Sequence, residues 1–132
     1  MLLLTKKYDL LVKEITKKSD DSGLVDSIKQ IIENYYYQDL KLDDIANSLS
    51  QSKSTICHEF KKHTGTNLSK YIRKMKCMHS LSLLEDTDTP VVNIASMLYF
   101  PDESNYITNF RKIYNVTPGE WRRRVRGKQT KV

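Results

Sequence analysis

Two stretches of the 132-residue chain repeat one pattern: "IANSLSQSKSTICHEFKK" (Ile45–Lys62) and "IASMLYFPDESNYITNFRK" (Ile94–Lys112). An Ile-Ala pair and a Leu recur 49 residues apart, and a Phe followed by two basic residues recurs 50 residues apart. In each stretch, apolar residues fall at helical spacing on both sides of a short polar turn. The repeat therefore predicts two copies of one unit, each made of a helix, a turn and a second helix.

Residues that start and stop helices support these units. Ser52 stands where it can cap the second helix of the first unit. Gly65 and Asn115 stand at matching stop positions, and both residue types suit a left-handed backbone. Asn67 can cap a long helix that follows, and "TPGE" (Thr117–Glu120) has the order of a capping box. In the second unit, Thr89 is expected as cap and Pro90 as first helical residue.

The chain as a whole predicts an all-α fold of about seven helices, with two helix-turn-helix subdomains joined by a long central helix. Only four glycines and three prolines are present, and periods of three and four dominate. The apolar stripe Leu4, Tyr8, Leu11 and Ile15 predicts a short N-terminal amphipathic helix, either a linker helix or a dimerising helix. A polar break follows, so this part takes residues 1–23. The main domain is expected over 24–132, with the first unit at about 42–65, the connecting helix at about 67–86, the second unit at about 89–115 and a C-terminal helix at about 117–125.

The excess positive charge lies in the region of the repeat and in the tail. Net charge is +6. Residues 1–41 carry seven basic and seven acidic residues, 42–86 carry seven and five, and 87–132 carry eight and four. This net charge indicates an acidic partner such as nucleic acid or an anionic membrane. The basic tail "RRRVRGK" (Arg122–Lys128) is consistent either with non-specific phosphate binding or with a solvated, frayed end.

The unit itself points to double-stranded DNA. A small Ala on the first helix allows a close crossing, and one aromatic residue on the second helix fills the gap, as in the helix-turn-helix arrangement that places its second helix in the major groove. The connecting helix of 20 residues would span about 30 Å. One turn of B-DNA is about 34–36 Å. We therefore expect two reading helices in successive major grooves of an asymmetric site.

The alternative is an all-helical protein-interaction or scaffold domain whose repeat serves packing only. Such a domain would carry exposed apolar residues on the outer faces of the units, where this sequence has Lys, Arg, Ser and Thr.

Several sequence motifs together resemble the DNA-binding domain of the AraC/XylS family of bacterial transcription regulators. The motifs are "LKLDDIANSLSQSKSTICHEFKKHTGTNLSKYI" and "LLEDTDTPVVNIASMLYFPDESNYITNFRKIYNVTPGEW", within roughly residues 24–124. The resemblance implies a bi-lobed helical domain on promoter DNA, in a cytoplasmic regulator whose class includes activators and response-regulator output domains. It further implies an upstream sensor or receiver domain, with RNA polymerase as a candidate partner.

The chain departs from the family pattern at four positions. Tyr99 replaces the usual Gly, and Pro101 replaces a Ser that normally caps a helix, a role that Asp102 can take. His58 and Thr108 stand where the family commonly has Arg on each reading helix. Because bidentate Arg–guanine contacts are the commonest specific readout, these two replacements bear on the base preference of each half.

Ten residues are predicted to contact DNA because they lie opposite the apolar face of each reading helix. Ser54, Cys57 and His58 are expected at base edges, and Lys53 and Lys61 at phosphates. Ile107 is suited to contact a thymine methyl group, and Thr108 is suited to contact a base or a phosphate. Glu103 either accepts a hydrogen bond from a cytosine or only stabilises the start of its helix without touching DNA. The full set is Lys53, Ser54, Cys57, His58, Lys61, Glu103, Ser104, Ile107, Thr108 and Arg111.

Other classes of function find little support in the sequence. Cys57, His58, His63, Cys77 and His79 fit no familiar zinc spacing, so no metal and no cofactor are expected. The two cysteines favour a reducing compartment over a disulfide framework. No phosphate-binding glycine loop or catalytic triad spacing is present, which argues against an enzyme. No apolar run approaches membrane-spanning length.

Overall fold

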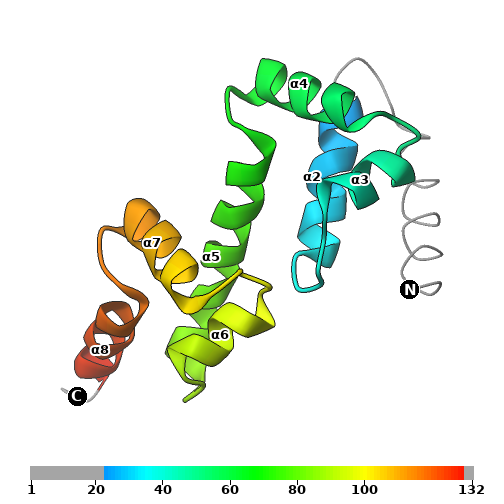
Figure 1. Ribbon diagram of the computed structural model, residues 1–132. Coiled ribbons are helices and arrows are strands. Elements are labelled where there is room, and N and C mark those ends of the chain that lie inside the picture. The colour runs from blue at the N-terminus through cyan, green and yellow to red at the C-terminus, as the bar shows by residue number, and fades with distance from the viewer. Residues whose placement is uncertain (1–22, 130–132) are drawn as a thin grey trace. The chain divides into compact units, whose positions relative to one another are not determined.

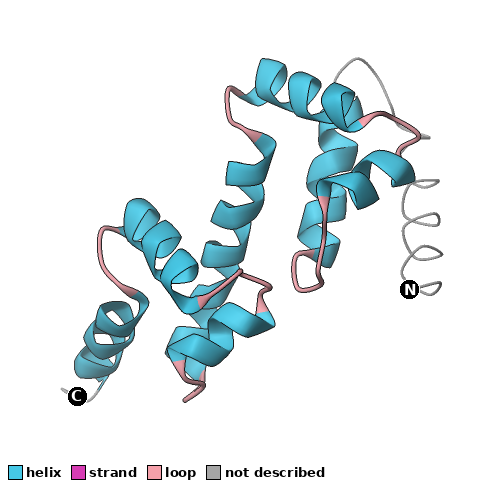
Figure 2. Cartoon of the chain, viewed as in Figure 1, coloured by secondary structure: helices cyan, strands magenta, loops and turns pink. Residues whose placement is uncertain are grey.

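The computed structural model describes residues 23–129, which form seven helices and no strand (Figures 1 and 2). The predicted all-α fold is confirmed, while the predicted N-terminal linker helix lies outside the described residues. The helices are α2 (Gly23–Tyr35), α3 (Leu42–Ser48), α4 (Lys53–Thr64), α5 (Leu68–Asp86), α6 (Val91–Met97), α7 (Glu103–Tyr114) and α8 (Pro118–Gln129).

The described chain divides into two compact units. The first comprises residues up to 36 together with 40–72, and the second comprises 37–39 and residues from 73 onward. The first unit therefore contains α2, α3 and α4, and the second contains α6, α7 and α8. The division falls within α5, whose residues 68–72 belong to the first unit and whose residues from 73 onward belong to the second.

The core of the first unit forms where α2 and α3 pack against α4. The side chains of Ile56 and Phe60 on α4 are fully buried, and Ile45 on α3 is fully buried as well. The Phe60 ring meets the ring of Tyr71 edge-on, with centroids 5.0 Å apart. From α2 the apolar side chains Val25, Ile28, Ile31, Ile32 and Tyr35 are buried, whereas Leu24, which the apolar spacing suggests as a core residue, is half-buried.

The second unit repeats this core with larger rings. Tyr106 and Phe110 on α7 are fully buried, as Ile56 and Phe60 are 50 residues earlier. Phe110 meets Trp121 of α8 in an edge-on contact with centroids 6.1 Å apart. This ring pair corresponds to Phe60 and Tyr71, so the aromatic match seen in the sequence is a match in packing.

The repeat also extends to α2 and α5, the helices that precede the two helix-turn-helix pairs. At an offset of 49, the buried residues Ile28, Ile31 and Tyr35 of α2 correspond to buried residues of α5. Those residues of α5 are Cys77, Ser80 and Leu84. The residue types differ at every one of these positions, which is why the sequence alone did not reveal this part of the repeat.

Both turns between the paired helices share one geometry. Ser50 (φ 54°) and Tyr99 (φ 60°) take the left-handed conformation directly after the end of α3 and α6. The N–H of the next residue reaches back to an alanine carbonyl in each case, from Gln51 to Ala46 at 2.9 Å and from Phe100 to Ala95 at 3.0 Å. This is the Schellman arrangement, which satisfies the final carbonyls of a helix.

Lys76 of α5 supports the second turn. Its side chain is only 7% exposed, and its Nζ donates to the Tyr99 carbonyl at 3.4 Å and lies 5.7 Å from the centre of the Phe100 ring. Burial lowers the pKa of the Lys76 ammonium group. Tyr99 therefore holds a backbone conformation that suits glycine, with a buried cation bound to its carbonyl.

Most helix starts and stops follow the sequence. The Ser52 hydroxyl accepts from the Thr55 N–H at 3.0 Å, and the Asp102 carboxylate accepts from the Asn105 N–H at 2.7 Å. The caps predicted at Asn67 and Thr117 are formed through the N–H groups of Lys70 and Glu120. Gly65 (φ 76°) and Asn115 (φ 65°) are left-handed at the ends of α4 and α7, as predicted.

The predicted start of the second unit is wrong by one residue. Pro90, rather than Thr89, is the N-cap of α6, and its carbonyl accepts the N–H of Ile94 at 3.0 Å. The Thr89 hydroxyl is instead bonded to the Thr87 hydroxyl at 3.0 Å. The Thr89 N–H also donates to the Thr87 hydroxyl oxygen, at 3.3 Å, so Thr89 belongs to the turn that follows α5.

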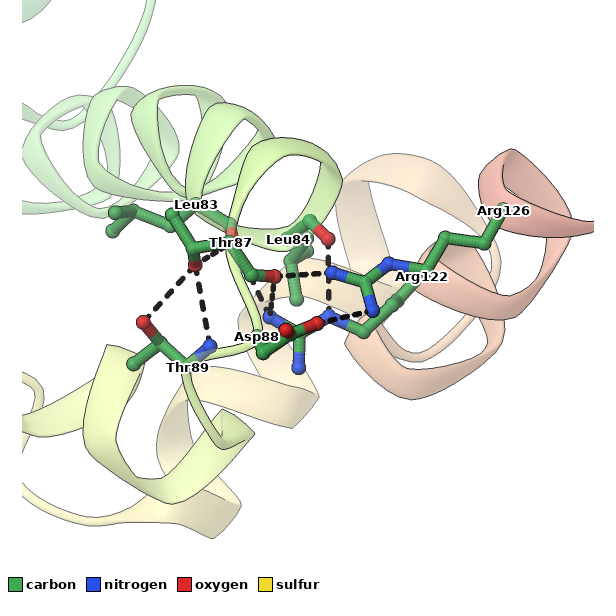
Figure 3. Close-up of polar contacts among 7 residues, drawn as sticks. All are labelled: Leu83, Leu84, Thr87, Asp88, Thr89, Arg122 and Arg126. Carbon is green, nitrogen blue, oxygen red and sulfur yellow. Dashed lines mark hydrogen bonds and ion pairs between the residues drawn. The ribbon is translucent and has the colours of Figure 1, made fainter. Parts of the chain in front are cut away.

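Two arginines of α8 bind the end of α5 (Figure 3). Arg122 donates from Nε to the Leu84 carbonyl at 3.0 Å and from a terminal nitrogen to the carbonyls of Leu83 and Thr87, both at 3.2 Å. Arg126 donates to the Thr87 carbonyl and pairs with the Asp88 carboxylate at 2.6 Å. Because α8 continues to Gln129, this part of the basic tail is an ordered helix, and two of its arginines hold the fold together.

Replacing Gly65 tests the left-handed end of α4. Gly65→Ala should lower the free energy of unfolding of the first unit by about 1 kcal/mol, because the added methyl group has open space around it and only the backbone conformation is penalised. Gly127→Ala, in right-handed helix with equally open space, is the control and should not lower stability. Urea denaturation of both variants measures the difference. Equal midpoints would contradict the backbone explanation.

Removing the Arg122 guanidinium tests the contact between α8 and α5. Arg122→Gln should destabilise the second unit by about 2 kcal/mol, since charge-assisted bonds to three carbonyls are lost from a half-buried site. The exposed neighbour Arg123 provides the matched control, Arg123→Gln, which should stay within about 0.5 kcal/mol of the wild type. Thermal melts followed by circular dichroism report both values, and a pair of identical melts would rule out this role for Arg122.

Candidate nucleic-acid interface

The second helix of each unit presents one buried face and one open face. On α4 the buried face is formed by Ile56 and Phe60, and on α7 by Tyr106 and Phe110. The two helices have the same length and the same sequence of exposed, half-buried and buried positions over 51–60 and 101–110. The open faces are therefore equivalent surfaces on the two units, available to a ligand.

All ten residues predicted to contact DNA lie on α4 and α7, and none of them is buried. Cys57 and Ile107, which are equivalent by the offset of 50, are half-buried. The other eight are exposed: Lys53, Ser54, His58, Lys61, Glu103, Ser104, Thr108 and Arg111. The structure thus places each residue within its unit on the face where the sequence predicted it.

The two reading helices differ in charge at their first turns. The first turn of α4 contains Lys53 and no acidic residue, so the positive end of the helix dipole is reinforced there. The first turn of α7 contains Glu103, directly after the carboxylate cap Asp102. A phosphate is therefore better accommodated at the start of α4 than at the start of α7.

A hollow of about 390 Å³ lies beside α4 in the first unit. It is lined by Cys57, His58, Lys61, Lys62, Asn67 and Leu68. Three of these were predicted to contact DNA, and two further polar residues, Lys62 and Asn67, were not. The signal for Lys62 was present in the sequence as the second member of the repeated basic pair.

A hollow of about 350 Å³ lies beside α7 in the second unit. It is lined by Arg73, Asp102, Ser104, Asn105, Thr108, Asn109 and Lys112. Ser104 and Thr108 were predicted, whereas Arg73 and Lys112 were not. Lys112 is the equivalent of Lys62 in the repeated basic pair. Arg73 lies on α5, outside the two repeated stretches of sequence, so the repeat did not point to it.

The two cysteines differ in burial, and two of the aromatic residues pack against the core. Burial raises the pKa of the Cys77 thiol to about 12, whereas Cys57 lies half-buried on the reading helix. The rings of Tyr71 and Trp121 pack against the core phenylalanines. These contacts favour the packing interpretation of both aromatic residues over base stacking. Among residues 23–129, no cluster of three or more metal-binding side chains is found.

The geometry defines a DNA-binding protein of the helix-turn-helix class: two units, each with an open second helix bearing cations and hydroxyls. A protein-family model described as "Helix-turn-helix domain" matches residues 45–124 of this chain. The chain belongs to the AraC/XylS family of transcription regulators, and its function is sequence-specific DNA binding in transcription regulation.

Several relatives and solved structures are similar to this chain. The Transposon Tn10 TetD protein of Escherichia coli is 34% identical over 92 residues, which cover 70% of this chain and 67% of TetD. A Chromobacterium violaceum transcriptional regulator described by its AraC-type DNA-binding domain has 26% identity and a TM-score of 0.70, over 76% of this chain and 90% of that one. The C-terminal domain of the two-component response regulator yesN from Fusobacterium nucleatum has 29% identity and a TM-score of 0.65, over 72% and 93%.

Some relatives are much longer than the matched region. The match covers 16% of a Bacillus subtilis transcriptional regulator and 48% of the Msm operon regulatory protein of Streptococcus mutans. None of the helices among residues 23–129 has the length and apolar character that a membrane span requires.

Proposed function

We propose that α4 and α7 each enter a major groove of one promoter site and that the ten predicted residues form the contacts. The observation that carries this proposal is the identical pattern of burial over 51–60 and 101–110, which leaves matching faces of the two helices open. The successive grooves expected from the length of the connecting helix would give an asymmetric site with two elements about one turn of DNA apart.

The assignments within the first unit follow from side-chain chemistry. His58 and Ser54 are exposed near the middle and the start of α4, where donors and acceptors can meet base edges. Lys53 and Lys61 lie at its two ends and suit phosphates. Cys57, beside His58 in the same hollow, is within the surface that bases would cover.

The second unit has a different set of reading groups. Ile107 offers an apolar contact for a thymine methyl group, while Ser104 and Thr108 offer hydroxyls. Arg111 is the exposed counterpart of Lys61 and suits a phosphate. Glu103 would accept from a cytosine or serve only the helix start.

The placement of exposed apolar side chains argues against the scaffold alternative for these faces. Among the described residues, no large exposed apolar side chain lies on α4 or α7. Those that occur elsewhere are Tyr37, Met78, Val92, Met97 and Tyr99. A protein-binding surface on the reading helices would require such residues there.

Protein partners belong to the same proposal. We infer that the chain operates with an upstream sensor or receiver domain, in a cytoplasmic regulator without catalytic activity. The matched yesN domain is described as the C-terminal part of a two-component response regulator, which supports a receiver as the upstream domain. RNA polymerase is the proposed second partner at a promoter.

Selection of bound duplexes from a random pool tests the proposal directly. We expect one asymmetric consensus with two conserved elements, and binding that weakens steeply as salt is raised. A palindromic consensus, or binding indifferent to salt, would overturn the arrangement of two reading helices from one chain.

Paired substitutions on α4 separate base contacts from phosphate contacts. His58→Ala should change the preferred base at one position, by about 1–3 kcal/mol of discrimination. Lys61→Ala should weaken every sequence alike and reduce the salt slope by about one. Competition assays on a panel of single-base variants measure both effects. Unchanged preference in the His58 variant would refute the base assignment.

Bound DNA should protect the thiol of Cys57. Alkylation of the native protein by iodoacetamide should modify Cys57 and leave Cys77 unmodified, because burial raises the pKa of the Cys77 thiol to about 12. Adding the selected duplex should slow modification of Cys57, as mass spectrometry of tryptic peptides can quantify. The same rate with and without saturating duplex would place Cys57 outside the interface.

A further inference from the structure

Arg73 is a cation without a structural partner among residues 23–129. It is half-buried on α5, yet it has no hydrogen bond and no ion pair with any residue of the described range. Arg122, which is also half-buried, uses its guanidinium on three carbonyls. The guanidinium of Arg73, unused within the described residues, is therefore available to an external anion.

The hollow beside α7 gathers groups that bind anions. Besides Arg73 it is lined by Lys112, which is exposed and likewise has no ion pair within residues 23–129. The hydroxyls of Ser104 and Thr108 line the same hollow and make no hydrogen bond to the described chain. Two cations and two hydroxyl donors from α5 and α7 therefore line one hollow.

Two other polar groups in the hollow are already engaged. The one acidic residue lining it, Asp102, accepts the Asn105 N–H at 2.7 Å. The Asn109 amide nitrogen donates to the carbonyl and the side-chain oxygen of Asn105, at 2.8 and 3.0 Å. The lining retains a net positive charge, and no ion pair uses either cation.

We propose that this hollow is a phosphate-binding subsite, in which Arg73 and Lys112 hold one backbone phosphate of the DNA. The proposal rests on the proposed function. It adds a contact from α5, a helix outside the helix-turn-helix unit. An Arg suits the role because its planar fork donates to two phosphate oxygens at once.

The first unit lacks a cation equivalent to Arg73. The offset of 49 that aligns the buried residues of α2 and α5 places Leu24 opposite Arg73. The second unit therefore gains a backbone contact that the first unit does not have. In the same unit, Thr108 occupies the position where the family commonly has Arg. Part of the affinity for DNA therefore comes from a phosphate contact instead of a base contact.

Charge-removing variants test the subsite on the full chain with the selected duplex and a scrambled duplex. Arg73→Gln and Lys112→Gln should each weaken binding to both duplexes roughly tenfold, with the base preference unchanged. Each should reduce the slope of log affinity against log salt by about 0.9. Lys74→Gln, on an exposed neighbour that does not line the hollow, is the matched control and should have a smaller effect. Circular dichroism melts confirm that the variants are folded.

A duplex with one neutral methylphosphonate, moved stepwise along the backbone, locates the phosphate. One position should weaken the wild type and leave the Arg73→Gln variant without further loss. Wild-type affinity in both variants, or losses that add at every position, would overturn the subsite while leaving base-specific binding intact. Failure of the wild type to bind any duplex would instead refute the proposed function.

A free anion is the other source of the same chemistry. Inorganic phosphate, titrated while the Arg73 Nε–H signal is followed by NMR, should shift that signal only at millimolar or higher concentration and should compete with DNA. Tight binding of inorganic phosphate, without any effect of Arg73→Gln on DNA affinity, would assign the hollow to a small anion and overturn the DNA proposal.

Discussion

Each reading helix depends on one fully buried phenylalanine. Phe60 on α4 and Phe110 on α7 have no exposed surface, and each meets a second aromatic ring edge-on. Burying one stripe of a 12-residue helix fixes its rotation about its own axis, because residues at helical spacing share a face. The groups left on the opposite face are therefore presented to the outside in a fixed order. Large-to-small changes at such rings typically cost several kcal/mol, so the reading face and the stability of each unit rest on the same side chain.

The turn before each reading helix sets where that helix begins. In both units a left-handed residue closes the first helix, and an extended capping residue opens the second. Neither left-handed residue is a glycine, and the conformation costs a non-glycine residue about 1–2 kcal/mol. At Tyr99 the residue is also bulky, for which this conformation is especially unfavourable. Two contacts offset the cost: Lys76 holds the Tyr99 carbonyl, and Asp102 caps α7 through the Asn105 N–H. The same turn geometry is thus reached from different sequences, by side chains contributed from a neighbouring helix and from within the turn.

The sequence predicted features that depend on residues close together along the chain. Ser52, Gly65 and Asn115 act on their own helix ends, and periodicity identifies the inward faces of α4 and α7 without any tertiary information. At the one wrong start, Thr89 bonds to Thr87 in the turn that follows α5, and α6 begins one residue later than predicted.

Contacts between distant segments could not be predicted in the same way. The basic tail suggested either DNA binding or fraying, yet Arg122 lies 38 residues from the Leu84 carbonyl that it binds. Arg73 and Lys76 belong to one helix, but one lines the hollow of α7 and the other lies under a turn. Which lysine or arginine is structural, and which is free to bind a ligand, is decided by packing that charge and periodicity do not record.

The two units share a scaffold but differ in how charge is used. In the first unit the open helix starts with Lys53 and no acid, so its dipole and its side chains both favour a phosphate there. In the second unit Asp102 and Glu103 occupy that end, which makes the start of α7 a poor place for a phosphate. Two cations of the second unit, Arg73 and Lys112, lie instead along its flank. A duplex bound by both units would therefore meet its phosphate contacts at different places on the two reading helices, and this difference, built into one chain, favours an asymmetric site over a palindrome.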